Sequence, residues 1–109
     1  MNWFSRLRLP AEAATETLPP EAVLIDVRTL GEYLAGHVQG AINLPLDQFA
    51  QRIAEVVPNK ATPVLLYCLS GARSGAACSH MQQLGYTDVR NGGSAGAVAL
   101  QLNRPIDRG

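Results

Sequence analysis

The 109-residue sequence has no excess of either charge, no long apolar run and no signal of secretion. Its nine basic and nine acidic residues cancel, and the few Lys and Arg form no stripe, so we expect no nucleic-acid binding. The apolar run Val64–Cys68 is far below the roughly 20 residues of a membrane span. Arg6 and Arg8 interrupt the first residues before an apolar stretch develops, so we expect no signal peptide and a cytoplasmic protein.

Cysteines and metal-ligand clusters are also scarce. Two cysteines, Cys68 and Cys78, do not make a disulfide framework, and the cytoplasm would keep them reduced. No group of His, Cys, Asp and Glu has the spacing of metal ligands, so we expect neither a metal nor another cofactor. One cysteine is therefore free to act as a reagent.

The residues that are present suit one folded domain. Hydrophobic residues make up 47% of the sequence and charged residues 17%, a balance that offers enough apolar surface to offset the entropy of the chain. A length of 109 residues suits a single hydrophobic core. We therefore expect one domain over residues 1–109.

Apolar runs that follow prolines predict buried strands. Residues 23–27 follow Pro19 and Pro20, and residues 64–67 follow Pro63, so each strand begins after a rigid turn. Near-continuous apolar strands are typical of a parallel sheet that helices cover on both faces. Weaker patterns predict further strands at 6–9, 41–43 and 88–90.

Helical spacing separates these strands. Apolar residues recur at this spacing over 46–57 and again from about Arg73 to Leu84, after which Gly85 supplies a stop. Shorter helices are predicted at 11–17 and 30–35, and another at 98–102 after a glycine-rich stretch. This alternation predicts a three-layer α/β domain with a mainly parallel sheet.

Cys68 ends a buried strand, at the edge where open α/β sheets bind ligands. The turn and helix start that follow it are Leu69, Ser70, Gly71, Ala72, Arg73 and Ser74. Backbone N–H groups in such a turn favour an anion, and they lower the pKa of a thiol below its usual value. Gly71 is able to adopt a positive φ, and Arg73 adds a positive charge. Ser74 either caps the helix or donates its hydroxyl to the sulfur.

The two cysteines are expected to differ in role. Cys68 has a plain structural interpretation as a small hydrophobe that finishes a core strand, but the anion-favouring turn favours a reactive thiol. Cys78 shares the apolar face of the following helix with Met81 and Leu84, so we expect it to pack in the core. A disulfide between the two is disfavoured, because the helix carries Cys78 away from the turn.

Three motifs in order resemble those of the rhodanese family. They are DVRT at 26–29 with EY at 32–33, GHVQGAINLP at 36–45, and YCLSGARS at 67–74. The resemblance covers about 23–93 and is closest to single-domain members such as the phage-shock and glycerol-operon sulfurtransferases. It departs after Gly92 and Gly93, where many relatives carry a tryptophan and this chain has SAGA at 94–97.

This resemblance implies a five-stranded parallel sheet and a persulfide carried on Cys68, held by the main chain of residues 69–74. A donor such as thiosulfate would transfer its outer sulfur to Cys68 with loss of sulfite. Cyanide, glutathione or a dithiol protein would then accept the sulfur. We expect a monomer or a weak dimer.

Asp26 and Arg28 are supporting candidates at the end of the first predicted strand. They either form an ion pair that supports the turn after Cys68 or cap their own turn, and we favour a structural role. The i,i+4 spacing of Arg28 and Glu32 also predicts a helix-surface pair between those two. His37 is expected to be architectural rather than a general base.

Two other functions stay open on the sequence. Phosphatase or arsenate reductase is a minor alternative, since cell-cycle phosphatases of this fold have five residues between cysteine and arginine, whereas only four separate Cys68 from Arg73. A phosphoryl group needs a wider loop than one sulfur atom does, so the shorter loop favours sulfur chemistry. The second alternative is a non-catalytic or sulfur-relay rhodanese module that acts through protein partners, although many non-catalytic modules lack the cysteine.

Overall fold

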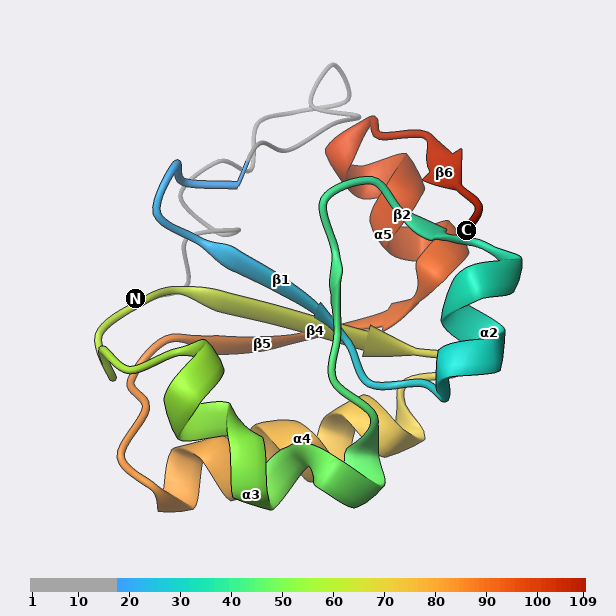
Figure 1. The fold of residues 1–109 in the computed structure, drawn as a ribbon. Coiled ribbons are helices and arrows are strands. Elements are labelled where there is room, and N and C mark those ends of the chain that lie inside the picture. The colour runs from blue at the N-terminus through green and yellow to red at the C-terminus, as the bar shows by residue number, and fades with distance from the viewer. Residues whose placement is uncertain (1–17) are drawn as a thin grey trace.

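Strands and helices alternate along residues 18–109, which are the residues that the computed structural model describes (Figure 1). The strand predicted at 6–9 and the helix predicted at 11–17 lie outside the described residues. The elements, in chain order, are β1 Val23–Asp26, α2 Leu30–Ala35, β2 His37–Val38, β3 Ile42–Asn43, α3 Leu46–Val56, β4 Val64–Cys68, α4 Ala72–Gln83, β5 Val89–Ser94, α5 Ala95–Leu102 and β6 Ile106–Asp107.

The central sheet of the described residues has four parallel strands in the order β3-β1-β4-β5. β4 lies inside the sheet and pairs with β1 along its length, from Val64 opposite Val23 to Tyr67 opposite Asp26. Because the strands are parallel, their carboxyl ends meet at one edge, where Cys68 lies. The predicted fold class is confirmed, and four of the five predicted strands are found here.

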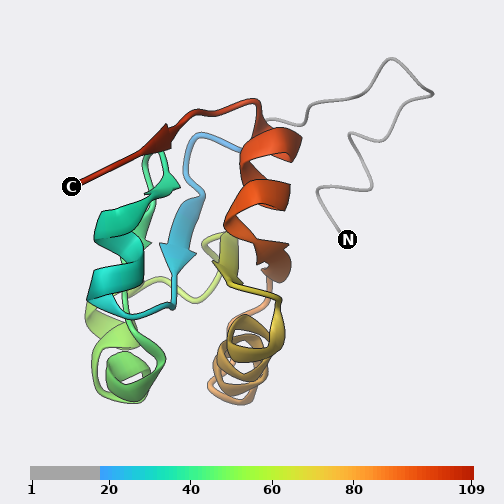
Figure 2. The same ribbon diagram turned by 90° about the vertical axis from the view of Figure 1, so that its right-hand side faces the viewer.

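The sequence of β4 explains why helices cover the sheet on both sides. All five of its side chains are buried, and successive side chains point to opposite faces of a strand. Val64, Leu66 and Cys68 pack in the core cluster that contains residues of α3 and α4. Leu65 and Tyr67 pack in a second cluster with residues of α5. Figure 1 shows this arrangement, with α3 and α4 below the sheet and α5 above it, and Figure 2 shows it from the side.

The C-terminal stretch is more regular than its glycines suggest. β5 extends to Ser94, and the Ser94 hydroxyl then accepts a hydrogen bond from Ala97 N–H and caps α5. Gly92 lies where β5 and α5 approach closely, since a Cβ there would stand 2.5 Å from Cγ2 of Val98. The glycine therefore permits α5 to pack against the sheet, and the helix begins three residues earlier than the predicted 98–102.

A second, antiparallel pair joins β2 to β6 at the end of the described chain, with His37 opposite Asp107 and Val38 opposite Ile106. Neither β2 nor β6 was predicted from the sequence. Within residues 18–109, no helix combines the length and apolar character needed to cross a membrane.

Candidate active site

Cys68 lies where β4 ends, and residues 69–74, called here the Cys68 loop, lead into α4. α4 begins at Ala72, and its N-cap is Gly71, with φ 100° and ψ −10°. This left-handed conformation favours glycine, as predicted. The Cys68 residue is only 1% exposed, whereas Leu69 beside it is 64% exposed, so the sulfur lies beneath the surface formed by the loop.

Hydrogen-bond donors of the Cys68 loop converge on the sulfur. The Gly71 N–H donates to Cys68 Sγ over 3.0 Å, and the Ser74 Oγ lies 3.4 Å from it. The backbone N–H groups of Ser70 and Ser74 also act on the thiol. Ser74 lies inside α4 rather than at its start, so the predicted alternative of a Ser74 helix cap is wrong.

These donors change the ionisation of Cys68. Burial by itself would raise the pKa of the thiol, but the hydrogen bonds from the loop outweigh it and lower the pKa from 9.0 to about 7. Cys78 provides the contrast, because burial alone acts on it and raises its pKa to about 11. Cys78 packs in the core with Met81, as predicted, whereas Leu84, which was predicted to share this face, is 38% exposed. At neutral pH the thiolate therefore forms on Cys68 and not on Cys78.

Arg73 is held by a partner that the sequence did not assign to it. Its two terminal nitrogens bind the two carboxylate oxygens of Glu32 at 2.8 and 3.0 Å, and both side chains are about one-third exposed. Glu32 also accepts from Thr29 N–H and completes the capping box of α2. These contacts, led by Arg73, lower the pKa of Glu32 to about 2. The predicted pair between Arg28 and Glu32 is therefore wrong.

Asp26 and Arg28 form the buried ion pair that was one of the two alternatives. Arg28 Nη2 donates to Asp26 Oδ2 over 2.7 Å and to the Gly36 carbonyl over 2.6 Å. Asp26 Oδ1 also accepts from the Arg28 N–H, so the carboxylate caps its own turn. The guanidinium stands 5.5 Å from the ring centre of Tyr67, the residue before Cys68. The pair thus fixes the segment after β1, next to Tyr67 of β4.

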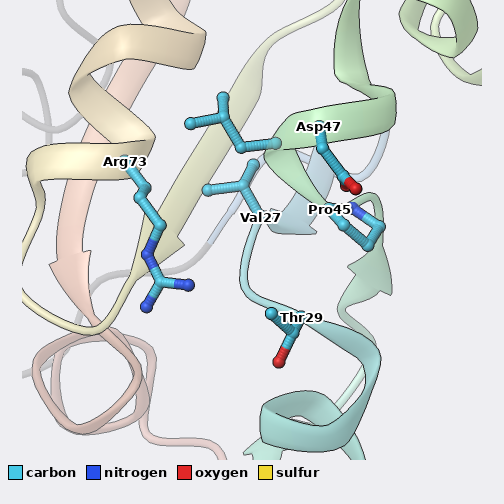
Figure 3. Close-up of a pocket in the computed structure, with 6 residues that line it drawn as sticks. Val27, Thr29, Pro45, Asp47 and Arg73 are labelled. Atoms are coloured by element: carbon cyan, nitrogen blue, oxygen red, sulfur yellow. The ribbon is translucent and has the colours of Figure 1, made fainter.

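A pocket of about 340 Å³ opens beside the Cys68 loop at the same edge of the sheet. Figure 3 shows Arg73 reaching it from the start of α4, opposite Pro45 and Asp47 at the start of α3. Val27 and Thr29, from the segment after β1, line the wall between them. The lining is mainly apolar side chains with one carboxylate and one guanidinium, so a small molecule is able to lie next to the loop.

Asn91 is the residue of this site that sequence reasoning missed. Its Nδ2 donates to the Gly71 carbonyl over 2.9 Å, and its Oδ1 accepts from Gly93 N–H over 3.0 Å. The Ser74 hydroxyl lies 2.7 Å from the same oxygen. Asn91 therefore joins β5 to the Cys68 loop, and its place just before two glycines is the only signal in the sequence.

His37 has the architectural role expected of it. The residue is buried in β2, its ring stacks on Tyr33 with centres 3.7 Å apart, and its Nδ1 lies 2.9 Å from the Tyr33 carbonyl. Among residues 18–109, His, Cys, Asp and Glu nowhere form a group of three that could hold a metal ion.

Comparison with known proteins identifies relatives that match most of this chain. A family model described as the rhodanese-like domain matches residues 10–93. The chain is 45% identical over 76 residues to thiosulfate sulfurtransferase PspE of Escherichia coli, a match that covers 70% of this chain and 73% of that protein. It is 35% identical over 92 residues to thiosulfate sulfurtransferase GlpE of Tolumonas auensis, covering 82% and 81%.

A solved structure has the same architecture. The structure titled "rhodanese with anions from E. coli" superimposes with a TM-score of 0.73 at 41% sequence identity. The match covers 81% of this chain and 99% of that one.

Proposed function

This chain belongs to the rhodanese-like family, and from that membership we propose that it is a sulfurtransferase that carries sulfane sulfur as a persulfide on Cys68. The observation that carries the assignment to Cys68 is the convergence of Gly71 N–H and the other loop donors on Sγ. Such donors stabilise a negative sulfur, which is both the attacking group and the group released at the end of the cycle.

The first half-reaction loads the sulfur. The Cys68 thiolate attacks the outer sulfur of thiosulfate, a new S–S bond forms, and the bond to the sulfonate sulfur breaks. The electron pair of that bond leaves with sulfite, and the outer sulfur stays on Cys68 as a persulfide anion. The N–H groups of the Cys68 loop hold the negative charge without taking up a proton, so the step needs no general base.

The second half-reaction removes the sulfur. A nucleophilic acceptor attacks the outer sulfur, the S–S bond breaks, and its electron pair returns to Sγ as a thiolate. Cyanide becomes thiocyanate, and a thiolate of glutathione or of a dithiol protein becomes a persulfide. The same loop donors stabilise the departing Cys68 thiolate, so one set of contacts serves both steps of a double displacement.

The pocket beside Arg73 supports a small donor and a thiol acceptor as partners. A cytoplasmic location suits this chemistry, because a reducing compartment keeps Cys68 as a thiol. We also propose that residues 1–109 form one domain and that the protein is a monomer or a weak dimer.

The contacts of Arg73 argue against the phosphatase alternative. An arginine that holds phosphate needs its two terminal nitrogens free, whereas both bind Glu32 here. The loop is also one residue too short, as the sequence indicates. A non-catalytic module has no need of a thiol whose pKa lies near neutrality, so the lowered pKa of Cys68 supports catalysis.

Intact mass spectrometry tests the proposal. Incubation with thiosulfate raises the mass of the protein by one sulfur atom, and cyanide then removes it. Cys68→Ser abolishes the gain, whereas Cys78→Ser, the matched control, keeps it. A gain that persists in Cys68→Ser and disappears in Cys78→Ser contradicts the assignment of the carrier.

A further inference from the structure

Ser74 lies between two atoms that compete for its single hydroxyl hydrogen. Its Oγ is 3.4 Å from Cys68 Sγ and 2.7 Å from Asn91 Oδ1. A hydroxyl has one hydrogen to donate and lone pairs with which it accepts. It therefore donates to only one of these two atoms at a time.

Backbone groups fix which face of Asn91 meets Ser74. Gly93 N–H donates to Asn91 Oδ1, and Asn91 Nδ2 donates to the Gly71 carbonyl. If the amide were flipped, its NH₂ group would face the Gly93 N–H, and its oxygen would face the Gly71 carbonyl, so neither hydrogen bond could form. The atom beside Ser74 is thus an oxygen without hydrogen. The contact of 2.7 Å forms only when Ser74 supplies the hydrogen.

The charge on Sγ decides between the two arrangements. When Sγ carries a proton or a second sulfur, it has no full charge, and the Ser74 hydroxyl donates to Asn91. When Sγ is a thiolate, it is the stronger acceptor, and rotation about the Cβ–Oγ bond brings the hydrogen to the sulfur. Only hydrogen bonds rearrange in this change, and no proton is transferred.

We propose that Asn91 is a positioning residue, which holds the Ser74 hydroxyl while Sγ is uncharged and releases it when Sγ becomes a thiolate. This inference rests on the proposed function, in which Sγ alternates between a thiolate and the inner sulfur of a persulfide. Asn91 touches neither the sulfur nor a substrate, and it acts through Ser74 and through the Gly71 carbonyl.

Asn91 acts on the Cys68 thiolate through the Ser74 hydroxyl and through the Gly71 carbonyl, and its loss has opposite effects on the thiolate by these two routes. A double-mutant cycle separates them. Asn91→Ala frees the Ser74 hydroxyl to donate to the thiolate, but it also removes the tether on Gly71. In a Ser74→Ala background only the loss of the tether remains. The difference between the two backgrounds isolates the route through Ser74. The nearby charged pairs, Arg73 with Glu32 and Asp26 with Arg28, are common to all four proteins and cancel.

The experiment is a pH titration of the Cys68 thiolate by its ultraviolet absorbance, in a Cys78→Ser background. With Ser74 present, Asn91→Ala favours the thiolate by about half a pKa unit more than it does with Ala at 74, or about threefold in the ratio of thiolate to thiol. Equal changes in the two backgrounds, or a difference of opposite sign, overturn the inference.

Asn91→Asp provides a second variant with the same side-chain size. Its carboxylate accepts the Ser74 hydrogen more strongly, so the difference between the two backgrounds changes sign and disfavours the thiolate. If Asn91→Ala does not fold, the comparison of Asn91→Asp in the two backgrounds still tests the inference. The sulfur load of the parent protein is measured in parallel. Absence of sulfur uptake refutes the proposed function, whereas absence of coupling refutes only the role of Asn91.

Discussion

Gly71→Ala tests whether the Gly71 N–H lowers the pKa of Cys68. Gly71 has φ 100°, and a Cβ there would meet Gly93 Cα at 3.4 Å, an ordinary contact. The substitution therefore costs backbone strain of about 1–2 kcal/mol rather than a collision. The loop relieves this strain by turning the 71 N–H away from Sγ, and a lost hydrogen bond to a charged group corresponds to about one pKa unit.

The expected result is a Cys68 pKa that moves from about 7 toward its ordinary value of 9.0. With a shift of about one unit, the thiolate fraction at pH 7 falls from about half to about a tenth. Sulfur uptake from thiosulfate at pH 7 then slows by about fivefold and recovers near pH 9. Rates of uptake measured by mass spectrometry across this pH range give the shift.

Gly85→Ala is the matched control. Gly85 has φ 98°, almost the same φ as Gly71, and lies beyond the far end of α4 beside Lys60. This variant suffers the same strain and a similar loss of thermal stability, but its pH profile stays at the wild-type position. An unchanged profile in Gly71→Ala, or an equal shift in Gly85→Ala, refutes the reasoning.

Three further predictions follow from the same site. In the Cys78→Ser protein, stability to denaturant, measured under reducing conditions, rises by about 2 kcal/mol from pH 7 to pH 9, because over this range unfolded Cys68 binds a proton that the folded thiolate lacks; Cys68→Ser removes the rise. Glu32→Gln leaves the charge of Arg73 unpaired and lowers the KM for dianionic thiosulfate by about twofold to fivefold at low salt, an effect that steady-state kinetics show fading as salt increases. Relative to its rate with glutathione, a bulky maleimide alkylates Cys68 much more slowly than iodoacetamide does, since the residue is 1% exposed; equal relative rates contradict the buried position.

Local sequence signals predicted the elements that hold the site. The apolar run of β4 and the glycine after Cys68 lie within a few residues of each other, so burial, strand end and turn are all visible in one short segment. Cys68, the proposed sulfur carrier, was separable from Cys78 for the same reason. Cys68 is followed directly by a turn whose backbone N–H groups face it, whereas Cys78 lies on the apolar face of a helix.

The contacts that were missed join residues far apart in sequence. Glu32 and Arg73 are 41 positions apart, and the nearer Arg28 satisfied the i,i+4 rule although it binds Asp26 instead. Asn91 contacts the loop only because β5 pairs with β4. Such pairings depend on the order of strands in the sheet, which local patterns do not contain.

The pH dependence of sulfur loading on Cys68 tests the central claim most directly. The rate at which thiosulfate adds one sulfur atom to the Cys78→Ser protein is measured by intact mass from pH 5 to pH 10. The donors around Sγ predict that the rate rises with a single inflection near pH 7. An inflection near pH 9, as for an ordinary thiol, or loading that survives Cys68→Ser, would contradict the account.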